Sequence, residues 1–163
     1  MHHLKRLLTR RLQAVPSKVI IGVLIVALIG FADAGYLTIE HYKNAIPPCS
    51  LTGGCETVLT SAYSTLLGIP VSLLGAIYYL IIAVGLFAFI ESKNHEVLRV
   101  ALLLTVLGFL ASIWFLYLQI FVIKAFCVYC LGSLATSTIL FISAAIVFER
   151  YKKSLDVPNE IKL

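Results

Sequence analysis

Four cysteines in two closely spaced pairs carry the clearest chemistry in the chain. Cys49 and Cys55 enclose a short polar loop, and Cys127 and Cys130 form a C-x-x-C motif. A disulfide stabilises a fold mainly by constraining the unfolded chain, and this gain grows with the length of the loop that it closes. Both loops are short here, and short, strained disulfides are the more easily reduced ones. The spacing therefore indicates thiol–disulfide exchange and electron relay more than structural bracing.

The two pairs are expected in different surroundings. Cys127 lies at the start of the last apolar segment, where the free N–H groups and the dipole of a helix N-terminus would lower the pKa of its thiol. Cys130 follows three residues later, on nearly the same helix face and one turn deeper in the membrane. One cysteine can then exchange with an outer partner while the other faces an apolar pocket.

A short surface helix is predicted after the loop pair. Apolar residues recur there at the spacing of a helix face, at Val58, Leu59, Ala62 and Leu66. Gly68 is expected to end this helix, which would lie on the outer membrane surface. The loop pair would then act as a mobile dithiol that meets a soluble protein and afterwards Cys127.

The elements that must position these cysteines are membrane helices. Hydrophobic residues make up 60% of the 163 residues, against about 45–50% in a soluble domain. Four apolar segments each reach the roughly 20 residues that a membrane-spanning helix needs, at 19–39, 70–90, 100–123 and 125–148. Pro70 suits the first turn of the second helix. The predicted fold class is all-α integral membrane, a four-transmembrane-helix bundle whose outer loop carries the surface helix.

The placement of basic residues predicts the orientation. Eleven of the 13 Lys and Arg residues lie at the two ends of the chain and in the connection 91–99, and only Lys43 and Lys124 lie in the other two connections. By the positive-inside rule both termini are cytoplasmic, and both cysteine pairs face outward, where disulfides persist. The net charge of +5 therefore indicates membrane orientation and no nucleic-acid binding. The expected domains are a basic cytoplasmic N-terminus, a transmembrane domain and a cytoplasmic tail, at 1–18, 19–148 and 149–163.

The first apolar segment has a second interpretation, as a cleavable signal. A basic lead and the stretch Ala32-Asp33-Ala34 fit one. Apolar character resumes after it, through Tyr36 to Ile39, and makes the segment longer than a signal core. A transmembrane helix is therefore favoured.

Two other interpretations of the four cysteines compete with a relay. They could form two structural disulfides in a non-enzymatic membrane scaffold, although the short loops argue against it. They could form a Cys₄ zinc site, but a pair spaced as Cys49 and Cys55 are, next to lipid, is unusual for zinc, and we expect no metal.

The chain resembles the vitamin K epoxide reductase family in its prokaryotic branch. The matching stretches are Asp33 to Thr38, Pro48 to Ser61, Gly68 to Gly75 and Cys127 to Cys130, within residues 20–148. The resemblance implies a four-helix bundle that holds a quinone, of the ubiquinone, menaquinone or phylloquinone type, beside the C-x-x-C motif. It also implies a separate thioredoxin-like (DsbA-like) partner that delivers electrons from substrate thiols.

The resemblance also implies roles for single residues. Cys49 and Cys55 would be the shuttle pair that meets the partner, Cys127 would accept the exchange, and Cys130 would face the quinone. Ser61 matches the serine or threonine that the family has near its active cysteines. The expected activity is a membrane quinone-dependent thiol–disulfide oxidoreductase that reoxidises its partner and so drives disulfide formation.

Departures from the family pattern bear on the reaction. A tyrosine and an asparagine that engage vitamin K in animal members are replaced by Leu134 and Val71 here. Reduction of vitamin K or its epoxide is therefore the alternative activity. The bacterial disulfide bond oxidase B family performs similar chemistry, but its two cysteine pairs come in the reverse order, which favours the vitamin K epoxide reductase family.

Several aromatic residues and one acid complete the candidate site. Trp114, Tyr117 and Phe121 share a helix face, and with Phe126 and Tyr129 they are expected to line the quinone pocket. An aromatic belt at the outer interface is the alternative. Asp33 is the one acid inside a predicted membrane segment, where it assists proton release during quinone reduction or reaches interfacial water.

Overall fold

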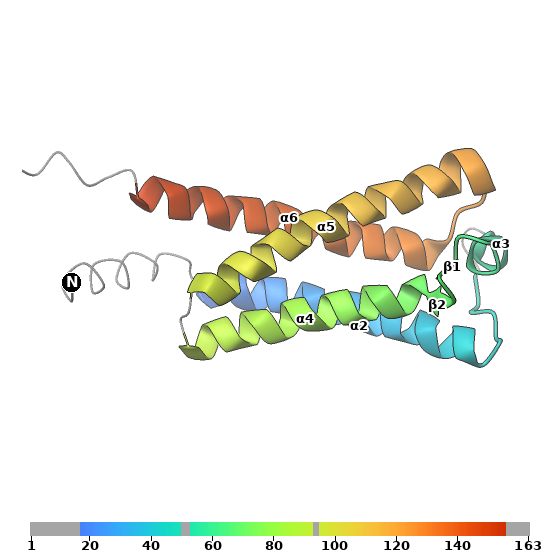
Figure 1. Ribbon diagram of the computed structural model, residues 1–163, viewed down its shortest axis with the longest axis horizontal. Coiled ribbons are helices and arrows are strands. Elements are labelled where there is room, and N and C mark those ends of the chain that lie inside the picture. The colour runs from blue at the N-terminus through green and yellow to red at the C-terminus, as the bar shows by residue number, and fades with distance from the viewer. Residues whose placement is uncertain (1–16, 50–52, 93–94, 156–163) are drawn as a thin grey trace, which may run out of the picture.

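The computed structural model describes residues 17–49, 53–92 and 95–155. Its four long helices lie along the long axis of the molecule (Figure 1). They are α2 (Ser17–Tyr42), α4 (Val71–Ser92), α5 (His95–Tyr117) and α6 (Val128–Leu155), and a π-helix, η1 (Leu118–Ile123), continues α5. Four helical spans are long and apolar enough to cross a membrane, which confirms the predicted bundle.

Glycines let the helices approach closely. A Cβ atom added at Gly30 of α2 would collide with the ring of Tyr79 of α4, and one at Gly108 of α5 would collide with the ring of Tyr78. Close packing of this kind holds membrane helices together, because lipid tails are as apolar as the helix surfaces. Tyr79 also donates a hydrogen bond to the carbonyl oxygen of Ser133, 2.9 Å away. Through these two tyrosines α4 contacts the other three long helices.

The outward side of the bundle is apolar. Large hydrophobic side chains are more than half exposed on every long helix, among them Ile29, Phe87, Leu107 and Ile142. Such a surface would be unfavourable in water, whereas in a bilayer it contacts hydrocarbon. The molecule is accordingly a multi-pass membrane protein.

The bundle has two distinct ends. The start of α2 and the end of α6 lie together at one end, and the short helix α3 (Cys55–Leu59) lies at the other, beside a two-stranded hairpin (Figure 1). The strands β1 (Thr65–Leu66) and β2 (Ile69–Pro70) are antiparallel, with Thr65 opposite Pro70. Everything that carries a cysteine therefore collects at the end opposite to the described chain ends.

The predicted surface helix is wrong in its extent. It exists as α3 but ends at Leu59, and Leu66 is paired in the hairpin instead. Leu67 and Gly68 both have positive φ, of 53° and 80°, which is the requirement of a two-residue hairpin turn with the primed geometry. Gly68 therefore makes a hairpin turn and does not end a helix.

The helix ends also differ from the prediction. Pro70 belongs to β2 and immediately precedes α4, so it is not in the first helical turn. The helices α2, α5 and α6 extend beyond the apolar segments, because charged Lys, Arg and Glu residues are themselves good helix formers. Within the predicted connection 91–99, residues 91–92 and 95–99 are helical. Residues 93–94 lie outside the described residues, as do 1–16, 50–52 and 156–163.

Candidate active site

The loop pair is oxidised. Cys49 and Cys55 form a disulfide with their Cα atoms 5.8 Å apart, within the range that such a bond allows. Cys55 is the first residue of α3 and is fully buried, whereas Cys49 is half-buried. Gly54 explains how the loop approaches the rest of the site, since a Cβ atom there would lie 2.8 Å from the carbonyl oxygen of Phe126. The glycine thus brings the disulfide directly against the connection before α6.

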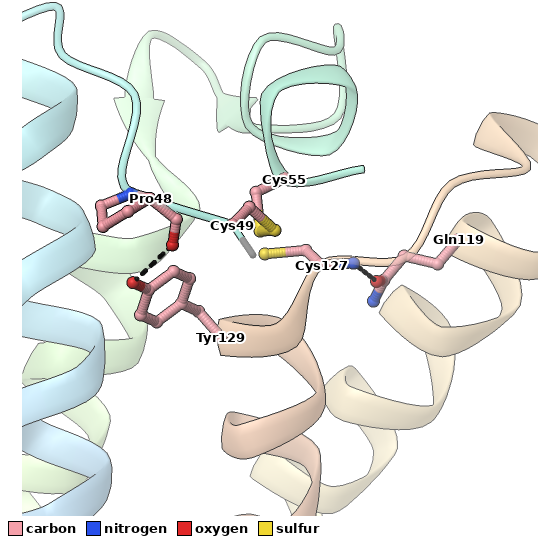
Figure 2. Close-up of a disulfide and its surroundings, with 6 residues drawn as sticks. All are labelled: Pro48, Cys49, Cys55, Gln119, Cys127 and Tyr129. Atoms are coloured by element: carbon pink, nitrogen blue, oxygen red, sulfur yellow. Dashed lines mark hydrogen bonds between the residues drawn. A yellow bond between two sulfur atoms is a disulfide. The ribbon is translucent and has the colours of Figure 1, made fainter. Parts of the chain in front are cut away.

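The second pair is reduced, and its two cysteines have different surroundings. Cys127 and Cys130 are both free thiols. Cys127 is fully buried in a cluster with Cys55 and Val58, and its sulfur points toward the loop disulfide (Figure 2). Cys130 instead lies on the wall of a large, partly open cavity between the long helices and the segments that carry the loop pair. The structure therefore holds an oxidised outer pair and a reduced inner pair in contact.

Cys127 is the N-cap residue of α6. Its carbonyl oxygen accepts the first helical hydrogen bond, from the N–H of Leu131 at 3.0 Å, and its sulfur occupies the place of a capping side chain. A hydrogen bond from the Cys130 thiol, together with the backbone N–H groups of Tyr129 and Cys130, lowers the pKa of Cys127 to about 7, against burial and the charge of Asp33. The surroundings of Cys127 therefore favour its thiolate, the form of a cysteine that attacks disulfides.

Gln119 is a site residue that the sequence reasoning missed. Its side chain is only 3% exposed, and its Oε1 accepts a hydrogen bond from the backbone N–H of Cys127 at 2.9 Å (Figure 2). A signal was present, because Gln119 is the one amide side chain in the apolar segment 100–123. Buried amides need hydrogen-bond partners, but the sequence did not indicate which partner this one has.

The cavity beside Cys130 has a volume of about 1350 Å³ and receives residues from all four long helices. It is larger than the roughly 300–1,000 Å³ of an ordinary small-molecule pocket, so a ring with a hydrocarbon tail fits. Its wall near the cysteine includes Cys130 and Ser133 of α6 and Gln119 of η1, and Ser61, Val71, Trp114 and Phe115 also contribute.

The predicted aromatic residues divide between the cavity and the outer surface. Trp114 lines the cavity, together with Phe115 next to it, although Trp114 is also 57% exposed, and the described lining does not include the other four. Tyr117 and Phe121 are 48% and 62% exposed, and Phe126 is 44% exposed. Ring centroids of Trp114 and Tyr117 lie 5.7 Å apart and those of Tyr117 and Phe121 lie 5.1 Å apart, an outward stack typical of an interfacial aromatic belt.

Tyr129 connects the site to the loop. Its hydroxyl donates a hydrogen bond to the carbonyl oxygen of Pro48, 3.2 Å away (Figure 2), next to Cys49. Its ring contacts that of Tyr36 in α2, with centroids 5.7 Å apart. Tyr129 therefore holds the loop pair against α2 and α6.

Ser61 and Asp33 both have hydrogen-bond partners. Ser61 follows α3, lines the cavity, and donates from Oγ to the carbonyl oxygen of Val58 at 2.7 Å. Asp33 Oδ2 accepts a hydrogen bond from the hydroxyl of Ser133 at 3.0 Å. Because Ser133 lies one turn after Cys130 on α6, this carboxyl is linked to the cavity wall beside the inner thiol.

One protein-family model matches a range of the chain that includes the whole candidate site. A scan against protein-family models matches residues 21–145 to the vitamin K epoxide reductase family. A search of the curated proteins finds no match. The matched range includes both cysteine pairs, Gln119 and the cavity.

Proposed function

The chain belongs to the vitamin K epoxide reductase family of membrane oxidoreductases acting on thiols, and we propose that it reoxidises a thioredoxin-like protein with a quinone as electron acceptor. The partner is a separate, DsbA-like protein that in turn forms disulfides in its own substrates. One observation carries this proposal. In a single C-x-x-C motif, the sulfur of Cys127 points toward an oxidised disulfide, and Cys130 lies on the wall of a cavity large enough for a quinone.

The outer half of the reaction is thiol–disulfide exchange. A thiolate of the reduced partner attacks the Cys49–Cys55 disulfide, and its second thiol resolves the mixed disulfide. The partner leaves oxidised, and both loop cysteines are reduced by two electrons and two protons. A loop thiolate then attacks the Cys127–Cys130 disulfide at Cys127, and the second loop cysteine displaces Cys127. The observed state, with the outer pair oxidised and the inner pair reduced, is the product of this step.

The inner half transfers the electrons to the cavity. Oxidation of the Cys127 and Cys130 thiols to a disulfide would release two electrons and two protons, which would reduce a quinone in the cavity to quinol. Cys130 delivers the electrons, and the Cys127–Cys130 disulfide forms again, which resets the cycle. Trp114 and Phe115 of the cavity lining would provide apolar rings for contact with the quinone, and Ser61 also belongs to this lining. Contacts of Tyr117, Phe121, Phe126 and Tyr129 with quinone stay predictions.

The same proposal includes the orientation of the protein. Both termini face the cytoplasm and both cysteine pairs face the outer, extracytoplasmic side. The excess of basic residues at the chain ends supports this, as does the arrangement of the bundle, in which α3 lies opposite the start of α2 and the end of α6 (Figure 1).

Reconstitution tests the reaction directly. Purified protein is mixed with a reduced DsbA-like protein and a short-tailed ubiquinone or menaquinone, and quinol formation is followed by absorbance. Wild type should turn over, and Cys130→Ala should lose at least about a hundredfold of the rate, because nucleophile removal abolishes covalent chemistry. Thr138→Val, which removes a hydroxyl that donates to the carbonyl oxygen of Leu134 in its own helix, is the control. Turnover that survives Cys130→Ala would refute the proposal.

Two alternatives give different results in the same preparations. A vitamin K epoxide reductase proper would convert the epoxide to the quinone with the same electron source, an activity that the family match favours. Val71 on the cavity wall lacks the amide that animal members have at this position. A scaffold with structural disulfides would keep its cysteines oxidised in cells whether or not respiration is blocked, whereas the proposed relay would accumulate free thiols.

A further inference from the structure

Gln119 lies where the cavity and the exchanging thiol meet. Its buried side chain lines the cavity, and its Oε1 accepts the backbone N–H of Cys127 at 2.9 Å. We propose that Gln119 is a positioning residue that holds Cys127 so that its sulfur stays aimed at the loop disulfide. The inference rests on the proposed function, in which Cys127 performs the exchange.

The π-helix places Gln119 for this role. Such turns are rare and frequently occur at functional sites. Here the backbone carbonyl oxygen of Gln119 accepts hydrogen bonds from the backbone N–H groups of Lys124 and Ala125, the second at 3.2 Å. Its side-chain oxygen accepts a hydrogen bond from the backbone N–H of Cys127. Lys124 has a φ of 55°, in the left-handed region. One glutamine therefore binds both ends of the four-residue connection from η1 to α6.

Three groups of Cys127 are held at the same time. Its N–H is bound by Gln119, its carbonyl oxygen by the N–H of Leu131 at 3.0 Å, and its sulfur lies beside the N–H groups of the first helical turn. A buried backbone N–H without a partner is unfavourable. Loss of the Gln119 acceptor would therefore let the Cys127 backbone rotate toward another partner and carry the sulfur away from both the helix N–H groups and the disulfide.

The charges around Cys127 make the effect measurable. Gln119 and a methionine in its place are both uncharged, so a change in the pKa of Cys127 in Gln119→Met would report a change of geometry. The side chains whose hydrogen bond or charge acts on the Cys127 thiol are Cys130 of α6 and Asp33 of α2. Other titratable groups on the surrounding elements are Tyr129 of α6, Tyr36 and Glu40 of α2, the exposed Glu56 of α3 and the exposed Lys124 after η1. The variants described next leave all of these in place.

The test compares Gln119→Met, which has a similar length but no acceptor, with Gln119→Glu, which keeps one. In a Cys49→Ala/Cys55→Ala background, alkylation of Cys127 is followed by peptide mass spectrometry as a function of pH. The methionine variant should shift the midpoint above pH 7, with roughly a three- to thirtyfold lower rate at neutral pH and an unchanged plateau in alkali. A role in stability alone would leave this midpoint in place.

Partner-driven quinone reduction, with the cysteines intact, provides the second readout. Gln119→Met should lower kcat by roughly tenfold with an unchanged KM for quinone, and Gln119→Glu should restore most of kcat at alkaline pH. If the methionine variant does not fold, the kcat of Gln119→Glu is compared with that of Gln119→Ala instead, and a higher kcat in Gln119→Glu supports the positioning role. Ser137→Ala, which removes a 1% exposed hydroxyl bonded to Ser112 at 2.7 Å, controls for loss of a buried polar group and should change neither readout.

Three outcomes separate the possibilities. An unchanged midpoint and kcat in Gln119→Met would overturn the positioning role while leaving the proposed function intact. A raised quinone KM with normal kcat would also overturn it, because Gln119 would then act on the quinone. Absence of quinone reduction in the wild type would instead overturn the proposed function itself.

Discussion

Two thiols three residues apart on one helix differ in every property that matters for exchange. Cys127 caps α6, is fully buried against the loop disulfide, and has its pKa lowered to about 7 by hydrogen bonds from the Cys130 thiol and the helix N–H groups. Cys130 lies inside the first turn and faces the cavity. The effect of a helix N-terminus on a thiol pKa falls off within the first turn, so the position of each cysteine along α6 makes the two thiols chemically different.

Asp33 permits a prediction at the scale of single residues. Its negative charge raises the pKa of Cys127 against the hydrogen bonds that lower it. Asp33→Asn should therefore move the midpoint of Cys127 alkylation below pH 7, so that the rate in mild acid rises by about twofold or more. Ser133→Ala is the control, because it removes the hydrogen bond to Asp33 but keeps the carboxyl group itself. An unchanged alkylation profile in Asp33→Asn would mean that the carboxyl is already neutral.

Short elements determine whether the two pairs meet. The helix α3 has only five residues, Cys55–Leu59, and the hairpin after it returns the chain to α4. The hydroxyl of Tyr129 binds Pro48, and Gly54 allows the loop to lie against the backbone of Phe126. These contacts hold the loop pair over α6, together with the buried apolar cluster of Cys55, Val58 and Cys127.

Gly54→Ala tests this arrangement of elements. The new Cβ would lie 2.8 and 2.9 Å from backbone atoms of Phe126, which cannot move as a flexible side chain does, so α3 should be pushed away from Cys127. We expect partner-driven quinone reduction to fall by roughly tenfold or more, with the helical circular dichroism spectrum unchanged.

Gly53→Ala is the matched control for the same loop. A Cβ at Gly53 meets no atom within 4 Å, although its φ of 64° adds strain of about 1 kcal/mol. Its activity should stay within about threefold of wild type. Equal losses in the two variants would show that loop flexibility, and not the contact with Phe126, determines the rate.

At the scale of the whole molecule, close helix packing surrounds a large cavity. The rings of Tyr78 and Tyr79 fill the spaces left by Gly108 and Gly30, while the cavity of about 1350 Å³ opens among the same helices nearer the cysteine end. A bundle can keep such a cavity only if its remaining contacts are tight, because apolar surface alone does not drive helices together in lipid.

Two alanine substitutions in α2 separate packing from helix propensity. Gly30→Ala should destabilise the bundle by about 1–3 kcal/mol, because the added methyl overpacks against the Tyr79 ring. Gly22→Ala meets no atom within 4 Å and should be neutral or stabilising by about 0.5–1 kcal/mol. Denaturant unfolding in detergent micelles measures both. Equal stabilities would contradict the proposed importance of the contact between α2 and α4.

The sequence by itself determined the four membrane helices, the fold class and the order of the cysteine pairs. Apolar runs of membrane length and the spacing of Cys49, Cys55, Cys127 and Cys130 are local properties of the chain, and local properties can be read without a partner element. The same locality explains the errors. Apolar residues at helical spacing predicted a helix through Leu66, whereas the positive φ of Leu67 and Gly68 made a hairpin.

Only the tertiary structure decided which residues hold each sulfur in place. The bond from Cys127 to Gln119 joins residues that a π-helix and a left-handed turn bring together, and no periodicity encodes it. The division of the aromatic residues is of the same kind, because Trp114 and Tyr117 share a helix face while only Trp114 lines the cavity. Packing between elements sets these positions, so they depend on the whole bundle and not on any one segment.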